Sequence, residues 1–141
     1  MEVVSRLGEE TRYPSVEQVS ELYDLMIKAS GGERGFVSRS NLDYLLDAVK
    51  DIGDRLPKRQ AIVKKAAFLL YNLVVIHPFL NGNKRIAFGL ADAFLETNGY
   101  ELASEAKEAY EFLIGIASSK VSEVEVEEWI ANHLSERREE K

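Results

Sequence analysis

The sequence predicts an all-α fold, a compact bundle of about six short helices with at most a short β-hairpin flap. Apolar residues recur at spacings of three and four along most of the chain, which is the period of one helix face. Proline occurs only three times, and alternating β-branched stretches are brief. A short strand or hairpin would fit near residues 3–7, 53–57 or 100–102. No heptad repeat is sustained, so we expect a globular bundle and not a coiled coil.

Helix-end signals delimit the first two helices. Ser15 and Gln18 have the spacing of a capping box, and Gly31 would end the helix that follows. The inward face of this helix is Val16, Val19, Leu22, Tyr23, Met26 and Ile27. Ser40 or Asn41 would stand near the start of the second helix, which runs toward Gly53. Its inward face is Leu42, Leu45, Leu46, Val49 and Ile52.

The next two helices form the centre of the predicted bundle. The third, from about residue 59 to 76, becomes apolar all round near its end, which is typical of a buried helix. A basic run near its start is interpreted as a solvated face and comprises Lys58, Arg59, Lys64 and Lys65. The fourth, from about 83 to 97, would turn inward Ala87, Leu90, Ala91, Phe94 and Leu95.

The last two helices are shorter. The fifth would pack through Ala106, Ala109, Tyr110, Leu113, Ile114 and Ala117. The sixth opens with a second capping box, Ser122 and Glu125, and would bury Val126, Trp129 and Ile130. We expect His133 to pack at the edge of this helix and not to bind a ligand.

Length and composition limit the class of protein. The 141 residues indicate one domain over 1–141, with an N-terminal extension over 1–14 and a polar tail over 135–141 that frays into solvent. The chain has no cysteine, which excludes disulfides, thiolate metal sites and a cysteine nucleophile. A formal net charge of −6 argues against direct nucleic-acid binding. No signal peptide or membrane-length apolar run is visible, so a cytoplasmic location is expected.

The segment between the third and fourth helices, HPFLNGNKR over residues 77–85, carries the chemistry. Pro78 disfavours a helical conformation at His77, so the third helix should end there. Gly82 permits a positive φ or a close approach of ligand to the backbone. Where the helix resumes, the N–H groups of residues 82–85 lack intrahelical partners, and the helix dipole adds to them. This arrangement predicts an anion site.

Side chains of the same segment suit a phosphate ligand. Arg85 can grip a phosphate with two parallel hydrogen bonds, and Lys84 adds a point charge. Asn83 can donate an amide N–H or cap the helix, and Asn81 can offer a carbonyl oxygen to Mg²⁺. A neutral His77 can take a proton from an attacking hydroxyl. Each residue alone has a plainer interpretation as a turn, a cap or a solvated cation, but their grouping favours a phosphate site.

This segment resembles the signature of the Fic/Doc family, in particular its Doc branch. The Doc pattern is H-x-F-x-(D/N)-(A/G)-N-K-R, and HPFLNGNKR fits it at every fixed position. The stretch LADAFLETNG over 90–99 is similar to the fourth Doc helix and its ending. The order of helices is compatible over about residues 15–134.

The resemblance implies a small helical Fic fold that binds ATP and Mg²⁺ and modifies a protein hydroxyl. Fic members transfer AMP. Doc is the toxin of a toxin–antitoxin pair and transfers the γ-phosphate to a threonine of a translation elongation factor. Carried onto this chain, His77 would be the general base, and Gly82, Asn83, Lys84 and Arg85 would hold phosphates. Asn81 falls where the metal-associated acid usually stands, and the implied partners are an antitoxin and a protein substrate.

Departures from the Fic pattern bear on the reaction. Lys84 stands where Fic has a second glycine, and Phe88 where Fic has a second arginine, which favours phosphate transfer over AMP transfer. The neutral Asn81 lowers the expected metal affinity and leaves open a catalytically weak phosphate-binding or interaction module. No inhibitory (S/T)-x-x-x-E-(G/N) helix is found, so restraint by a separate antitoxin is expected.

Overall fold

A computed structural model describes residues 10–137 and confirms the all-α class in that part of the chain. Its helices are α2 (Val16–Ser30), α3 (Arg39–Ala48), the 3-10 helix η1 (Val49–Asp51), α4 (Lys58–Ile76), α5 (Asn83–Thr97), α6 (Ala106–Ala117) and α7 (Glu123–His133). Two short strands, β1 (Tyr100–Leu102) and β2 (Leu134–Glu136), complete the described elements. Within residues 10–137, no helix reaches the length and hydropathy that a membrane crossing requires.

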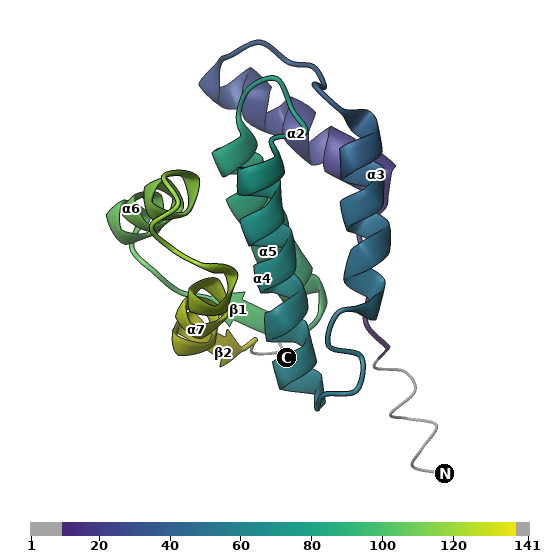
Figure 1. The fold of residues 1–141 in the computed structure, drawn as a ribbon, viewed down its shortest axis with the longest axis vertical. Helices are drawn as coiled ribbons and strands as arrows, with labels where there is room; N and C mark the ends of the chain where they lie inside the picture. Colours follow the sequence, from purple (N-terminus) through teal and green to yellow (C-terminus); the bar gives the residue numbers. More distant parts are fainter. Residues whose placement is uncertain (1–9, 138–141) are drawn as a thin grey trace.

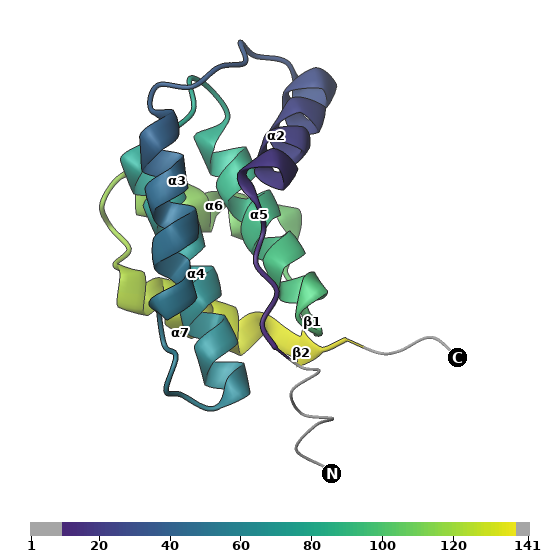
Figure 2. The same ribbon diagram turned by 90° about the vertical axis from the view of Figure 1, so that its right-hand side faces the viewer.

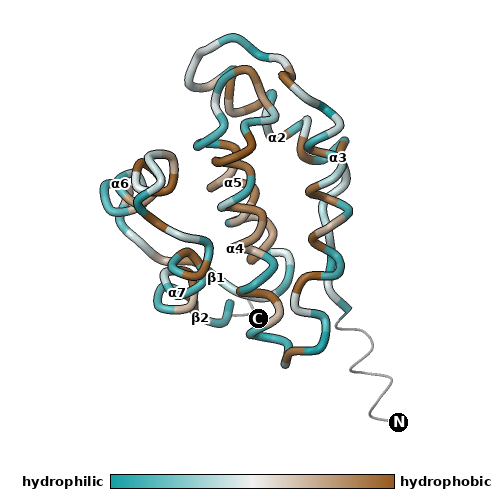
Figure 3. The backbone as a smooth tube through the Cα atoms, in the orientation of Figure 1, coloured by the Kyte–Doolittle hydropathy of each residue, from teal (hydrophilic) through white to brown (hydrophobic). Residues whose placement is uncertain are grey.

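Helix α4 is the centre of the bundle, as its apolar composition predicts. It packs against α3, α5, α6 and α7, and Figure 1 shows these helices around it. The hydropathy colouring of Figure 3 is brown along much of α4 and α5, where the core lies. Because α4 has neighbours on most sides, it buries residues all round and not along a single stripe.

Burial of α4 also corrects one expectation about the basic run. Lys65 is only 2% exposed and does not belong to a solvated face. Its ammonium donates hydrogen bonds to the carbonyl oxygens of Val49 and Lys50 at 3.3 and 3.1 Å and to Asp54 Oδ1 at 3.1 Å. The first two residues of η1, together with Asp54, therefore supply the acceptors that a buried lysine requires. Lys64, by contrast, lies near the surface and pairs with Glu127 at 3.0 Å.

The local helix signals hold in most places. Both capping boxes are present, at Ser15 with Gln18 and at Ser122 with Glu125. The start of α3 differs, because its N-cap is Ser38, whose hydroxyl accepts from the Asn41 N–H, and not Ser40 or Asn41 itself.

On α6 the inward face was predicted incorrectly in part. Tyr110 and Ile114 are 61% and 40% exposed, since the helix packs on α4 and α5 through Ala109, Leu113 and Ile116.

Strand β1 confirms the expectation at 100–102, but its partner is distant in sequence. It pairs antiparallel with β2, with Tyr100 opposite Glu136. The first residues of the predicted fraying tail, Ser135 and Glu136, are thus held in a sheet. Residues 53–57 form turns and no strand, and the expectation at 3–7 lies outside the described residues.

The segment before α2 runs along α5 (Figure 2). Asn98 exchanges two hydrogen bonds with the backbone of Arg12, at 2.8 and 3.0 Å. Tyr13 lies beside Phe94, with ring centroids 6.2 Å apart. At the end of α7, His133 packs as expected: it stacks on Trp129 and its Nε2 lies 3.0 Å from Glu108 Oε2.

Candidate functional site

The connector between α4 and α5 begins at His77, where the helix ends as predicted. His77 is the C-cap of α4, and its N–H donates to the Leu73 carbonyl at 3.3 Å. Its backbone is left-handed, with φ 56° and ψ 60°, which is uncommon for a residue other than glycine. The side chain is exposed, so an incoming hydroxyl can reach it.

Two residues give the connector a closed shape. Asn83 Oδ1 accepts from the Phe79 N–H at 3.0 Å, and Asn83 Nδ2 donates to the Phe79 carbonyl at 2.8 Å. The Phe79 ring is 1% exposed and anchors the loop in the core. The Asn83 side chain is therefore engaged with the loop, and its backbone N–H is the group it can present to an anion.

The start of α5 has the features of an anion site. Gly82 is its N-cap, with φ 79°, and no side chain caps the helix. Among residues 10–137, no acceptor is found for the backbone N–H groups of residues 83–85. A Cβ at position 82 would lie 3.2 Å from Ile27 Cδ1, so glycine suits both the φ and the packing there. Uncapped N–H groups and the helix dipole together favour a bound phosphate.

The two cations next to this helix start have different surroundings. Lys84 is exposed and has no hydrogen-bond or ion-pair partner in the described part of the chain. Arg85 Nη1 donates to the Ser30 hydroxyl and, at 3.4 Å, to the Gly31 carbonyl at the end of α2. No acceptor of Arg85 Nη2 is found among residues 10–137, so its N–H groups remain available as donors.

A second loop, residues 31–38 between α2 and α3, lies against the connector. Asn81 Oδ1 accepts from the Glu33 N–H at 2.8 Å, and the Leu80 N–H donates to the Gly35 carbonyl at 2.8 Å. The Pro78 carbonyl accepts from two N–H groups of the same loop. Figure 1 shows the two loops together at one end of the molecule. No local pattern in the sequence predicts this contact, because the residues that it joins are forty or more positions apart.

Two further side chains at the site were missed. The helical period predicts Tyr23 only as part of the apolar face of α2. In the structure its hydroxyl donates to the backbone carbonyl of Asn81. Ser30 was not singled out, and it holds Arg85. Neither carries a signal in the sequence, since Tyr23 matches the helical period and Ser30 stands where a helix end is expected.

The residues fit a phosphate group better than a bare metal ion. Asn81 Oδ1 already accepts one hydrogen bond, and its Nδ2 donates to the Leu80 carbonyl at 2.9 Å. Within residues 10–137, no group of three or more histidine, cysteine, aspartate or glutamate side chains could hold a metal ion. A divalent cation here would therefore depend on oxygens supplied by the ligand.

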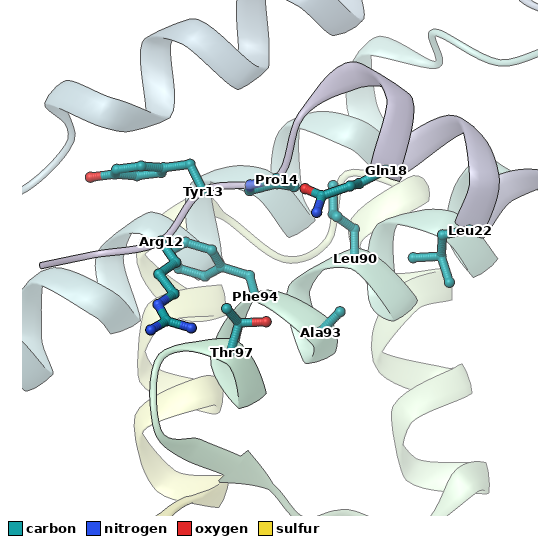
Figure 4. A pocket seen from close by; sticks show the side chains of 9 residues that line it. All are labelled: Arg12, Tyr13, Pro14, Gln18, Leu22, Leu90, Ala93, Phe94 and Thr97. Atoms are coloured by element: carbon teal, nitrogen blue, oxygen red, sulfur yellow. The ribbon is translucent and has the colours of Figure 1, made fainter. Parts of the chain in front are cut away.

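A separate hollow of about 520 Å³ lies between residues 12–14, the first half of α2 and the second half of α5 (Figure 4). Leu22, Leu90 and Phe94 give it apolar walls, and Arg12 lies at its edge. None of its lining residues belongs to the 77–85 segment. It is therefore distinct from the candidate anion site at the start of α5.

The fold and the uncapped start of α5 define an all-α protein with a candidate anion site at the junction between its two central helices. A family model described as the Fic/DOC family matches residues 13–95, which contain α2 to α4, the connector and all of α5 except its last two residues. This match covers more than half of the chain, and the chain belongs to the Fic/DOC family. Members of this family are generally protein-modifying transferases. The curated proteins include no match to this chain.

Proposed function

We propose that this chain is a Doc-like kinase, which transfers the γ-phosphate of ATP to a hydroxyl of a protein substrate. The observation that carries the proposal is the uncapped start of α5, with Lys84 and Arg85 beside it and His77 at the other end of one short connector. Lys84 in place of the second Fic glycine favours this reaction over AMP transfer.

The proposed reaction assigns a task to each residue. His77 takes the proton of the substrate hydroxyl, and the hydroxyl oxygen forms a bond to the γ-phosphorus. The bond between that phosphorus and the bridging oxygen breaks, and ADP leaves with the electron pair. The N–H groups at the start of α5, with Gly82, Asn83, Lys84 and Arg85, hold the phosphates and disperse their charge.

ATP with Mg²⁺ is the proposed cofactor. Bound Mg²⁺ would neutralise phosphate charge, and Asn81 is the proposed protein contact through the amide oxygen of its side chain, Oδ1. Because no cluster of carboxylates or histidines that could hold a metal ion is found among residues 10–137, we propose that the cation enters with the nucleotide.

The proposed partners are a translation elongation factor as substrate and a separate antitoxin protein as inhibitor. Both come from the likeness of HPFLNGNKR to the Doc signature. The proposed antitoxin segment is a helix that lies in an apolar groove beside the connector. Expression of the chain alone should arrest growth, and co-expression of a neighbouring small gene should relieve the arrest. A chain that is harmless when expressed alone would contradict the toxin role.

Labelled ATP tests the reaction. Purified chain is incubated with an elongation factor and with ATP labelled at either the γ- or the α-phosphate. Transfer of the γ-label alone to protein supports the kinase, and transfer of the α-label identifies an AMP transferase. Binding of ATP without either transfer would identify a phosphate-binding module with weak chemistry, which the neutral Asn81 makes the second candidate.

A further inference from the structure

The hydroxyl of Tyr23 lies where the two loops of the site meet. The Tyr23 residue is 3% exposed, and its oxygen is 2.9 Å from the Asn81 carbonyl oxygen. The Gly35 nitrogen and carbonyl oxygen both lie 3.4 Å from it. The tyrosine hydroxyl has a single hydrogen to donate. The shortest contact assigns this hydrogen to the backbone carbonyl oxygen of Asn81, and the hydroxyl oxygen then accepts from the Gly35 N–H.

Packing does not account for this hydroxyl. The Tyr23 ring stacks on Phe79, with centroids 4.1 Å apart, and Phe36 lies 5.0 Å from the same ring. A phenylalanine at position 23 would make the same ring contacts and would avoid burying a polar atom. The hydroxyl therefore serves the backbone groups it touches.

The contact with Asn81 has a consequence for the anion site. The Asn81 carbonyl and the Gly82 N–H belong to one planar trans peptide, in which they point in opposite directions. A hydrogen bond that holds the carbonyl oxygen thus also sets the direction of the Gly82 N–H. That N–H is the first donor of the predicted anion site at residues 82–85.

We propose that Tyr23 is a positioning residue for phosphoryl transfer, acting through the Asn81–Gly82 peptide. The inference rests on the proposed function for its catalytic consequence. Tyr23 orients a donor toward the transferring phosphate, while Lys84 and Arg85 on α5 hold the nucleotide independently of it. Misplacement of a reacting or stabilising group by a small distance costs mainly rate, up to about a hundredfold.

The test compares Tyr23→Phe with Tyr13→Phe. Both variants lose one phenol oxygen, but Tyr13 lies away from the loops and its oxygen is 3.5 Å from the Lys50 carbonyl. In the γ-label assay, Tyr23→Phe should lower kcat about ten- to hundredfold and change the KM for ATP less than threefold. Tyr13→Phe should keep both constants. Wild-type kcat in Tyr23→Phe would overturn the proposal.

An activity-independent measurement separates this inference from the proposed function. Amide NMR of Gly82 is recorded during ATP titration, with melting temperatures measured on the same samples. We expect Tyr23→Phe to lose most of the ATP-induced shift at Gly82 while it melts within a few degrees of wild type. If the wild type transfers no label, the kinase proposal fails, and the Gly82 shift still decides the role of Tyr23. Equal shifts in wild type and Tyr23→Phe, or none in either, would overturn the inference.

Discussion

The side chain of Asn81 joins the connector to Glu33. Its Oδ1 accepts from the Glu33 N–H at 2.8 Å, while its Nδ2 donates to the carbonyl of the neighbouring Leu80. An amide can both accept and donate in this way, and a carboxylate cannot. The structure thus gives a physical role to the neutral residue at this position of the signature.

Asn81→Asp should separate the loop contact from metal binding. A carboxylate keeps the Glu33 contact with one oxygen and offers the other to Mg²⁺, so Mg²⁺ should bind more tightly in the presence of ATP. Loss of the donor to Leu80 should lower the free energy of unfolding by about 1 kcal/mol. Calorimetric Mg²⁺ titration and urea unfolding measure the two effects. Unchanged Mg²⁺ dependence would place Asn81 away from the cation.

His77→Ala should abolish most transfer without weakening ATP binding. General-base catalysis contributes about 10²–10⁴-fold, and the proposed phosphate donors lie on a different element, at the start of α5. Turnover and ATP affinity are measured on the same preparation, and affinity should stay within a few-fold of wild type. Normal turnover would remove the assignment of the base. Joint loss of turnover and affinity would instead make His77 a structural residue of the loop.

Arg85→Ala should weaken ATP binding more than Lys84→Ala. The Ser30 hydroxyl already orients the Arg85 guanidinium, whose planar fork of donors matches a phosphate, whereas Lys84 is exposed and offers a single point charge. Loss of a charge-assisted contact costs about 1.5–3 kcal/mol, or roughly ten- to hundredfold in affinity. Calorimetry with both variants measures this, and equal ATP affinity in the two variants and wild type would contradict the site.

Lys65→Met should destabilise the fold far more than Lys64→Met. Removing the Lys65 ammonium takes away the charged donor shared by the Val49 and Lys50 carbonyl oxygens and Asp54 Oδ1, and loss of hydrogen bonds from a charged group costs about 1.5–3 kcal/mol. Lys64 makes a surface pair with Glu127, worth about 1 kcal/mol or less. Urea unfolding of both variants is the measurement. Equal destabilisation would show that burial of Lys65 is not important for stability.

Asp92 on α5 makes the free energy of unfolding depend on pH. Burial, and after it the charges of Glu96 and Glu101, raise the pKa of Asp92 above its ordinary value of 3.8. The folded state thus binds the proton more readily than the unfolded state, so ionised Asp92 destabilises the fold at neutral pH. This penalty disappears as the pH falls from above the raised pKa toward 3.8.

Asp92→Asn should therefore raise the melting temperature at pH 7. The advantage over wild type should shrink as the pH is lowered and Asp92 takes up its proton. Melting curves from pH 7 to about 4 measure the difference, within the range in which Asp92 titrates. A constant difference across that range would mean that the substitution acts by packing and not by charge.

Local chemistry in the sequence determined the helices and the composition of the site. The capping boxes at Ser15 and Ser122 and the positive φ of Gly82 depend on atoms within a few residues, so they can be predicted without the fold. The sequence also predicted that His77 ends one helix and that Arg85 lies in the first turn of the next. Both helix ends depend on neighbouring residues, so they can be predicted without the fold.

Tertiary structure alone decided which distant groups meet there. Tyr23 and Glu33 reach Asn81 only because α2 packs on α5 and brings the loop of residues 31–38 against the connector. The same holds for Lys65, whose charge is accommodated by carbonyl oxygens of η1 and by Asp54, and for the pairing of β1 with β2. Hydrophobic periodicity identifies a buried face but not its partner, since apolar attraction has no direction. Packing of the whole chain then selects the polar contacts.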